Sequence, residues 1–309
     1  MESMVDEEVR GEVGMCNIQK MILSMGYSPN EVDSNGWTLL HLAAALGNEH
    51  VIKTLIQYGV NPEIQDNVRG FTCLHYAAMH GFTRLARILL EVTKDKFHFI
   101  DTPNIDGWTP LHVAAHYGRD KIVKTLLYFK ATVDPLSLEG TTPLQLAVMK
   151  QKVNCVRKLI GAKARINVQG GFPLRHAIIK GYLKIAELLL KEGADPTLVR
   201  EEDNQTPLHL AVLRDEVELC KILYRFGALC WVHNDNGETP LTIATVKIRV
   251  NEEVSSRSCL PILEAFAGHP RSLKSLCRFV IRENVYCLSE LHQLPLPTLM
   301  VSYLKYKFD

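Results

Sequence analysis

Four histidines occupy one position of a phrase that recurs along the sequence: His41, His75, His112 and His209. An imidazole can ligate a metal ion or exchange a proton near neutral pH, so a repeated histidine is the first candidate for chemistry. Both chemistries need the rings to converge on one point, whereas residues at one position of successive stacked units form a row. We therefore predict that these histidines make structural hydrogen bonds around the turn of each repeat.

A denser cluster contains four histidines and two adjacent tyrosines: His75, His80, His112, His116, Tyr76 and Tyr117. Four imidazoles could in principle form a metal site. The neighbouring phenol rings, however, are typical of a contact surface, because aromatic side chains are enriched where proteins meet. We therefore expect a contact surface here and no metal ion.

No grouping of residues indicates an enzyme. The eight cysteines, at positions 16, 73, 155, 220, 230, 259, 277 and 287, include no C-x-x-C pair of the kind that a RING zinc site needs and no dense disulfide spacing. The sequence also lacks a glycine-rich phosphate loop and a Ser, His and acid grouping that rises above chance. We therefore predict a non-catalytic protein with no cofactor, whose cysteines are reduced thiols.

The composition limits which kinds of partner and which cellular compartments are expected. Lys and Arg total 35 against 34 Asp and Glu, so no net field draws the chain to nucleic acid or to an anionic membrane. No apolar run approaches the ~18 residues that span a bilayer, and the acidic stretch 1–13 does not resemble a secretory signal. We expect a cytoplasmic and/or nuclear protein that binds neither nucleic acid nor membrane.

The repeated phrase is Gly-x-Thr-Pro-Leu-His, and its Thr position falls at residues 38, 72, 109, 142, 172, 206 and 239, with Phe at 172. A Thr hydroxyl can cap a helix N-terminus, and the following Pro has its φ preset for the first helical position. Paired small residues such as Ala114 and Ala115 let neighbouring helices pack closely. Glycines at 47, 81, 118 and 181 then end the first helix, and a second apolar helix follows. One such unit cannot bury its faces alone, so stacking is required.

The intervals between these positions, from 30 to 37 residues, match the ankyrin period, and residues 33–267 resemble about seven ankyrin repeats. The near-consensus runs 108–115 and 205–211 carry the resemblance. It implies an all-α ankyrin-repeat solenoid of helix-turn-helix units with β-hairpin tips, and residues 1–32 are expected to form a tail and a degenerate capping repeat. The hairpin before Phe172 is about three residues short, which is consistent with either a shaped binding face or a neutral deletion.

A different pattern occupies residues 268–309. Apolar residues at 273, 276, 277, 280 and 281 fall on one helical stripe, and a Leu-Pro-Leu-Pro run follows. The two motifs resemble the SOCS box. The resemblance implies elongin binding by Leu273, Leu276, Cys277 and Ile281 and cullin binding by Leu294, Pro295, Leu296, Pro297 and Leu299.

Together the two parts resemble the ankyrin repeat and SOCS box family over essentially the whole chain. The resemblance implies a substrate-recognition subunit of a ubiquitin ligase that contains Elongin B, Elongin C, Cullin-5 and RING-box protein 2. Target proteins would be bound for ubiquitination and proteasomal degradation, and the sequence does not identify them. The alternative is an ankyrin scaffold protein outside any ligase, in which the apolar stripe only caps the last repeat.

By the same resemblance, the residue before each Thr and the two residues before each helix-ending Gly point to the concave face that binds partners. Aromatic and apolar residues gather at these positions in the first three units. The predicted substrate-binding residues are Trp37, Leu46, Phe71, Met79, His80, Trp108, His116 and Tyr117. Aromatic anchors carry much of the energy of protein interfaces, so we expect the substrate to bind across units one to three. Alternatively, these rings stack on one another and only stiffen the array.

Overall fold

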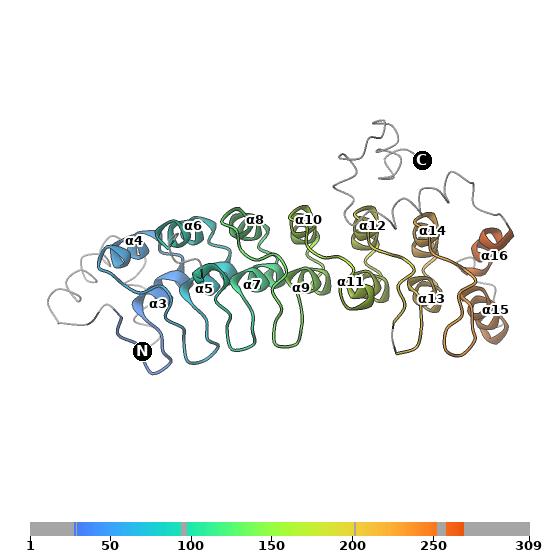
Figure 1. Cartoon of the computed structure of the whole chain (residues 1–309), viewed down its shortest axis with the longest axis horizontal. Coiled ribbons are helices and arrows are strands. Elements are labelled where there is room, and N and C mark those ends of the chain that lie inside the picture. The colour runs from blue at the N-terminus through green and yellow to red at the C-terminus, as the bar shows by residue number, and fades with distance from the viewer. Residues whose placement is uncertain (1–27, 29, 94–97, 201, 252–257, 269–309) are drawn as a thin grey trace, which may run out of the picture. The chain divides into compact units, whose positions relative to one another are not determined.

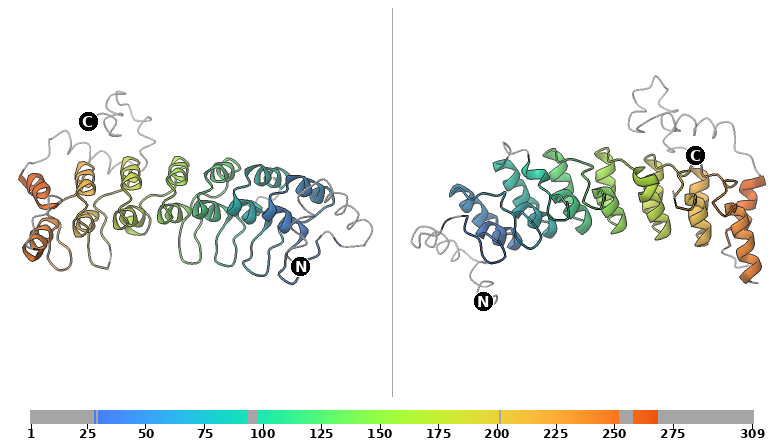
Figure 2. Two further views of the ribbon diagram at one scale, coloured as in Figure 1. Left: turned by 180° about the vertical axis from the view of Figure 1, so that it is seen from behind. Right: turned by 60° about the horizontal axis from the view of Figure 1, so that its bottom comes forward.

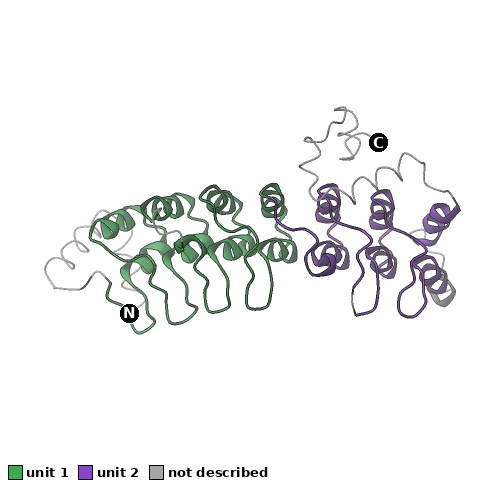
Figure 3. Ribbon diagram, in the orientation of Figure 1, with its two compact units in different colours: residues 1–162 green, residues 163–309 purple. Residues whose placement is uncertain are grey.

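The computed structural model describes residues 28, 30–93, 98–200, 202–251 and 258–268. These residues form helices joined by turns, and none of them lies in a β-strand (Figure 1). The chain divides into two compact units, residues 1–162 and residues 163–309 (Figure 3). Each unit is built from helix pairs, as the repeated phrase predicts.

The described residues of unit 1 form four helix pairs. The first helices are α3 (Leu39–Leu46), α5 (Cys73–His80), α7 (Pro110–Tyr117) and α9 (Pro143–Met149), and the second helices are α4 (Glu49–Gln57), α6 (Thr83–Val92), α8 (Asp120–Tyr128) and α10 (Val153–Gly161). A short 3-10 helix, η1 (Phe99–Asp101), precedes the third pair. First helices pack on first helices and second helices on second helices, which produces two layers (Figures 1 and 2).

Unit 2 repeats the plan. Its first helices are α11 (Val168–Ile179), α13 (Pro207–Leu213) and α15 (Pro240–Asn251), and its second helices are α12 (Leu183–Lys191), α14 (Val217–Arg225) and α16 (Leu260–Gly268). Here too each helix packs on its partner and on the equivalent helices of the adjacent repeats. The neighbouring repeats therefore supply the apolar contacts that a single helix pair lacks.

The first helices begin as the sequence predicts. Thr109 is the N-cap of α7, with an extended backbone, and Pro110 takes the first helical position. Thr38, Thr72, Thr142 and Thr206 are likewise N-caps with an extended backbone, and a Pro follows the last two. At the other end of α7, Gly118 has φ +74 and its N–H donates to the carbonyls of Ala114 and Ala115. A residue with a Cβ would be strained in this left-handed conformation, so the glycine fixes the end of the helix.

The predicted role of the repeated histidines is confirmed. The Nδ1 atom of His75 accepts a hydrogen bond from the backbone N–H of Thr72 at 3.1 Å, and its Nε2 atom lies 2.9 Å from the carbonyl oxygen of Trp108 in the next repeat. His41, His112 and His209 bridge in the same way to the carbonyls of Phe71, Thr141 and Glu238. Each ring therefore joins a helix start to the neighbouring repeat.

Small and aliphatic residues fill the space between the layers. The alanine pairs 43–44, 77–78 and 114–115 are at most 1% exposed, which confirms that they permit close helix packing. Leu74, Leu89, Leu111 and Leu126 are completely buried among them. The core is thus continuous within unit 1 and not divided by repeat.

The expected hairpin tips are tight turns in the described residues. In the third tip the Oδ1 atom of Asn104 accepts from the backbone N–H groups of Asp106 and Trp108 at 3.0 and 2.7 Å. The next tip is joined to it by a bond from the N–H of Leu138 to the carbonyl of Asp106 at 3.0 Å. One such bond between tips is too few to define a ladder, which explains why no strand is present.

The shortened fifth tip has an unusual backbone. Residues 169–171, at the start of α11, all have positive φ values of 47, 58 and 76°, so the regular part of the helix begins after Gly171. The Arg175 guanidinium donates to the carbonyls of Gly170 and Val199 and holds this turn in place. The missing residues are replaced by a compact left-handed turn.

Candidate protein-binding face

The predicted substrate-binding residues lie on the first helices of unit 1 and on the turns that precede them. Because α3, α5, α7 and α9 stack side by side, equivalent positions form rows along the unit. We call the exposed part of these rows the first-helix face. It consists of Trp37, Leu46, Met79, His80, Trp108, His116, Tyr117 and Met149.

Three rings form the centre of this face. The Trp108 ring lies 5.0 Å from the His116 ring, which in turn lies 5.0 Å from the Tyr117 ring. Trp108 and His116 are half-buried and Tyr117 is exposed. This arrangement combines a large apolar surface with polar ring edges, as in aromatic anchors of protein interfaces.

His80 and His116 carry little positive charge at neutral pH. Burial lowers the pKa of His116, and the nearby ammonium groups of Lys150 and Lys152 lower it further. Burial and the Arg119 guanidinium likewise lower the pKa of His80. The Nδ1 atom of His116 is buried without a hydrogen-bond partner within the described part of the chain.

Phe71 does not lie on this face, so the prediction that its side chain is exposed is wrong. It is only 4% exposed, stacked at 5.0 Å on the His75 ring and 5.5 Å from the Tyr76 ring. Tyr76 also packs against Trp37 at 5.0 Å and donates a hydrogen bond to the buried carboxylate of Asp66 at 2.8 Å. The alternative prediction, that rings stiffen the array, therefore describes Phe71.

Sequence reasoning missed a second row, which lies directly after the helix-ending glycines. A Cβ built on Gly47 would lie 2.7 Å from the ring of Phe82, one on Gly81 would lie 3.1 Å from Cδ of Arg119, and one on Gly118 would lie 2.6 Å from Cδ of Lys152. Each of these side chains thus lies over the glycine of the preceding repeat. The signal was present in the sequence, since all three residues follow the glycine position of their own repeats.

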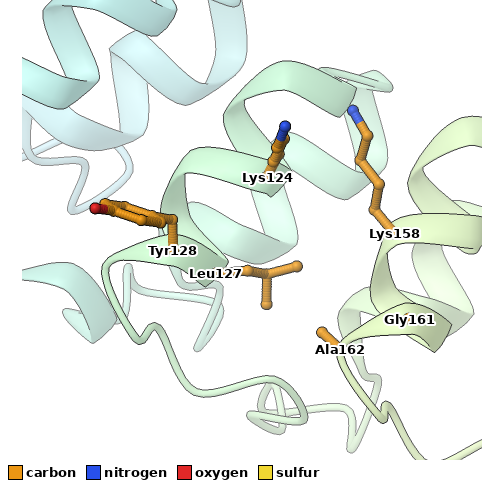
Figure 4. Close-up of a pocket in the computed structure, with 6 residues that line it drawn as sticks. All are labelled: Lys124, Leu127, Tyr128, Lys158, Gly161 and Ala162. Atoms are coloured by element: carbon orange, nitrogen blue, oxygen red, sulfur yellow. The ribbon is translucent and has the colours of Figure 1, made fainter. Parts of the chain in front are cut away.

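The second-helix layer carries a pocket of about 440 Å³ lined by Lys124, Leu127, Tyr128, Lys158, Gly161 and Ala162 (Figure 4). The Lys158 ammonium group is paired with the Asp120 carboxylate and also donates to the Asp120 carbonyl at 2.8 Å. The lining holds two lysines, the phenol of Tyr128 and apolar atoms, but no nucleophile and base in contact. It gives no basis for a catalytic site.

The described residues contain no group of three or more His, Cys, Asp or Glu side chains that could hold a metal ion. Their cysteines, at 73, 155, 220, 230 and 259, are buried. Burial raises the pKa of the Cys155 thiol to about 11, so it is protonated at neutral pH and a poor nucleophile. Among the helices described here, none has the length and apolar character to cross a membrane.

Overlapping matches to a family model for ankyrin repeats (3 copies) extend over residues 11–99, 59–137, 122–200 and 174–254. The chain belongs to the ankyrin-repeat family. A model for the SOCS box matches residues 269–305. Ankyrin repeats and a SOCS box are therefore both present, and both are non-catalytic adaptor domains. No enzymatic domain was identified by these matches.

Relatives and solved structures agree on the repeat. The chain is 32% identical to the ankyrin repeat protein nuc-2 of Neurospora crassa over 70% of its own length and 20% of that protein. It is 28% identical to the human transient receptor potential cation channel subfamily A member 1, over 68% of its own length and 19% of that protein. The chain thus spans about a fifth of the length of these relatives.

Two crystal structures share the fold. The human ASB11 ankyrin repeat domain aligns with a TM-score of 0.60 at 26% identity, over 76% of this chain and 100% of that one. The ankyrin repeat domain of Bcl-3, described as a member of the IkappaB protein family, aligns with a TM-score of 0.63 at 26% identity. The alignment covers 75% of this chain and 100% of that one. Both likenesses support the ankyrin architecture.

The predicted docking residues lie outside the described residues. They comprise the elongin-binding set Leu273, Leu276, Cys277 and Ile281 and the cullin-binding set Leu294, Pro295, Leu296, Pro297 and Leu299. All nine fall within the SOCS box match at 269–305. The predicted N-terminal tail and cap also lie almost entirely outside the described part of the chain.

Proposed function

We propose that this chain is the substrate-recognition subunit of a ubiquitin ligase that contains Elongin B, Elongin C, Cullin-5 and RING-box protein 2. The observation that carries the proposal is the SOCS box match at 269–305, which contains both docking motifs in order and follows a stack of ankyrin repeats. Such a receptor contributes proximity and orientation, because ubiquitin reaches a lysine that is held near the charged carrier enzyme. No catalytic residue is required of it.

The docking residues can be tested by co-expression of the full chain with Elongin B and Elongin C. The double variant Leu273→Ala/Cys277→Ala is expected to lose co-purification of both elongins. The variant Lys274→Ala serves as the matched control, because the sequence pattern predicts that this position lies away from the apolar stripe. Retention of the elongins by the double variant would refute the docking assignment and favour a scaffold whose C-terminal segment only caps the repeats.

The second motif has a separate readout. Pro295→Ala/Pro297→Ala is expected to keep the elongins but to bind Cullin-5 with RING-box protein 2 more weakly, because the prolines preset an extended segment. Biolayer interferometry with immobilised receptor and elongins measures this difference. Loss of the elongins together with the cullin would instead indicate a general folding defect.

We propose further that target proteins bind the first-helix face of unit 1. The support is the ring group of Trp108, His116 and Tyr117, which provides exposed aromatic surface in the middle of that face. Phe71 is excluded from the proposed site because it is buried, and its truncation would lower stability by ~3–5 kcal/mol.

The variant Trp108→Ala/Tyr117→Ala tests this face. It is expected to lose the proteins that proximity labelling assigns to the parent chain while the cullin is blocked. Tyr128→Ala is a matched control, because Tyr128 is 76% exposed on α8 in the second-helix layer. Equal labelling by the parent and the double variant, with unchanged thermal unfolding, would show that the face is not the binding site.

A further inference from the structure

Three cationic side chains lie at one corner of the first-helix face. Arg119 and Lys152 belong to the row that follows the helix-ending glycines, and Lys150 lies between Met149 and that row. None of the three takes part in an ion pair within the part of the chain that the structure describes. We call them the basic corner.

The basic corner is directly connected to the aromatic group. The Arg119 side chain lies over Gly81, and its Nε atom donates to the Met79 carbonyl at 2.9 Å. Lys152 lies over Gly118, and Gly118 is the residue that follows Tyr117 in the sequence. Lys150 and Lys152 are close enough to His116 to depress the pKa of its ring, after the larger effect of burial. Apolar and cationic groups thus share one continuous surface.

Two repeats in unit 2 show that the fold does not require the cation at this position to be unpaired. Lys180, Arg214 and Lys247 occupy the position that Lys150 occupies in its own repeat. Among the described residues Lys180 takes part in no ion pair, whereas the other two cations do. Arg214 faces Glu216 at 3.8 Å, and Lys247 pairs with Asp215 at 2.8 Å. In those repeats a carboxylate of the same chain compensates the cation. In the basic corner no described carboxylate does so.

The other half of the surface consists of apolar and aromatic side chains. On the first-helix face, Leu46, Tyr117 and Met149 are 39, 38 and 37% exposed, and Trp108 is half-buried. The His116 ring lies 5.0 Å from the rings of Trp108 and Tyr117, and its buried Nδ1 atom has no hydrogen-bond partner among the described residues. An unpaired buried nitrogen in a folded protein calls for an explanation, and a partner that reorients the ring would provide one.

We infer that this surface binds a protein segment in which one large apolar side chain is followed or preceded by Asp or Glu residues. The apolar side chain packs on the Trp108, His116 and Tyr117 rings, and the carboxylates face the basic corner. The inference deepens the proposed function and rests on it for the role of the bound segment. Charge complementarity selects an acidic partner, because like charges brought together here would repel.

The probe is a displayed library of random 15-residue peptides, selected on the immobilised full chain in complex with Elongin B and Elongin C. We compare the parent with the charge-reversal variant Arg119→Glu/Lys150→Glu/Lys152→Glu. The control variant Arg84→Glu/Arg87→Glu/Lys124→Glu makes the same change of net charge at exposed positions of α6 and α8. We expect the parent and the control to enrich peptides with Asp or Glu near an aliphatic or aromatic residue.

Affinity of one selected peptide then gives the magnitude. The charge reversal is expected to weaken binding by at least about 10-fold, and the control variant to change it by less than about 2-fold. Replacing the peptide's acidic residues by Asn and Gln should produce a similar loss, and added salt should reduce the difference, since exposed charges are screened.

Selected peptides without acidic enrichment, equal binding by parent and charge-reversal variant, or no selected binder at all would each overturn the inference. Elongin co-purification is measured on the same preparations. If the chain retains the elongins but the selected peptides show no preference for acidic residues, only the inference is refuted. Elongins absent from the parent chain refute the proposed function, and selection on the full chain alone still tests the surface.

Discussion

Acid should destabilise unit 1 through His75, and the size of the effect follows from its surroundings. The ring is completely buried, accepts from the Thr72 N–H at Nδ1 and donates from Nε2 to the Trp108 carbonyl. Only a neutral ring with its proton on Nε2 makes both bonds. Burial lowers its pKa from 6.5 to about 4, although the Trp108 carbonyl and Asp66 oppose this shift.

The sign of the pH effect follows from proton uptake. Between pH 6.5 and about 4 the unfolded chain binds a proton at this histidine and the folded chain does not, so the free energy of unfolding falls as the pH falls. Each pKa unit corresponds to ~1.36 kcal/mol, which gives a loss of about 2 kcal/mol at pH 5 and about 3 kcal/mol below pH 4. Burial shifts the pKa values of His41, His112 and His209 in the same direction.

The variant His75→Gln removes the titration and keeps the helix start. The chain itself supplies the precedent, because Gln145 occupies this position in the fourth repeat and its Oε1 atom accepts from the Thr142 N–H at 2.7 Å. In a Trp231→Phe background, fluorescence reports Trp37 and Trp108, both in unit 1. Urea unfolding at pH 7.5 and pH 5.0 should show that the parent loses about 2 kcal/mol more than the variant.

The control is His50→Gln, which changes an exposed histidine on α4 and should leave the pH dependence as it is in the parent. If the parent and His75→Gln lose equal stability between the two pH values, the buried ring does not carry the acid sensitivity. The assignment of its tautomer and of its low pKa would then be refuted.

Two further predictions concern the tips and the thiols. Gly107→Ala should lower the free energy of unfolding by about 2 kcal/mol or more, against about 1 kcal/mol for Gly59→Ala, in urea unfolding. Both glycines have φ near +76°, but a Cβ on Gly107 would lie 2.7 Å from the Leu138 backbone nitrogen, whereas nothing lies within 4 Å of one on Gly59; similar losses would contradict the tip contact. Cys73, Cys155, Cys220, Cys230 and Cys259 should resist N-ethylmaleimide in the native chain and react after unfolding, as followed by peptide mass spectrometry. Fast native labelling of Cys155 would show that burial does not protect it.

The helix starts and ends were predictable because their determinants are local. Thr109, Pro110 and His112 lie within one turn, and Gly118 ends the same helix, so four positions of the sequence define the element. The row of structural histidines followed for the same reason, since one position per repeat must fall at one height of the stack. The two motifs within the SOCS box match could also be recognised from the sequence alone, because each is a continuous string of residues.

Which ring is exposed was not decided locally. Trp37, Phe71 and Trp108 all precede the capping threonine, yet only Phe71 is buried. Its ring packs edge-on against Tyr76 at 5.5 Å, and Tyr76 is hydrogen-bonded to Asp66. The second tip also contains one more residue than the first and third tips. Exposure therefore depends on contacts between turns and helices that no repeat consensus specifies.

The basic corner also depends partly on the local sequence and partly on packing between repeats. The sequence places Arg119 and Lys152 one position after the site of a helix-ending glycine, but it does not show that each side chain crosses to an adjacent repeat. Only stacking brings Arg119 over Gly81 and Lys152 over Gly118, about one repeat length away in the chain. The sequence by itself determined the repeat and its helix boundaries, because these depend on local backbone preferences. The tertiary structure decided which side chains share a surface, because that depends on packing between repeats.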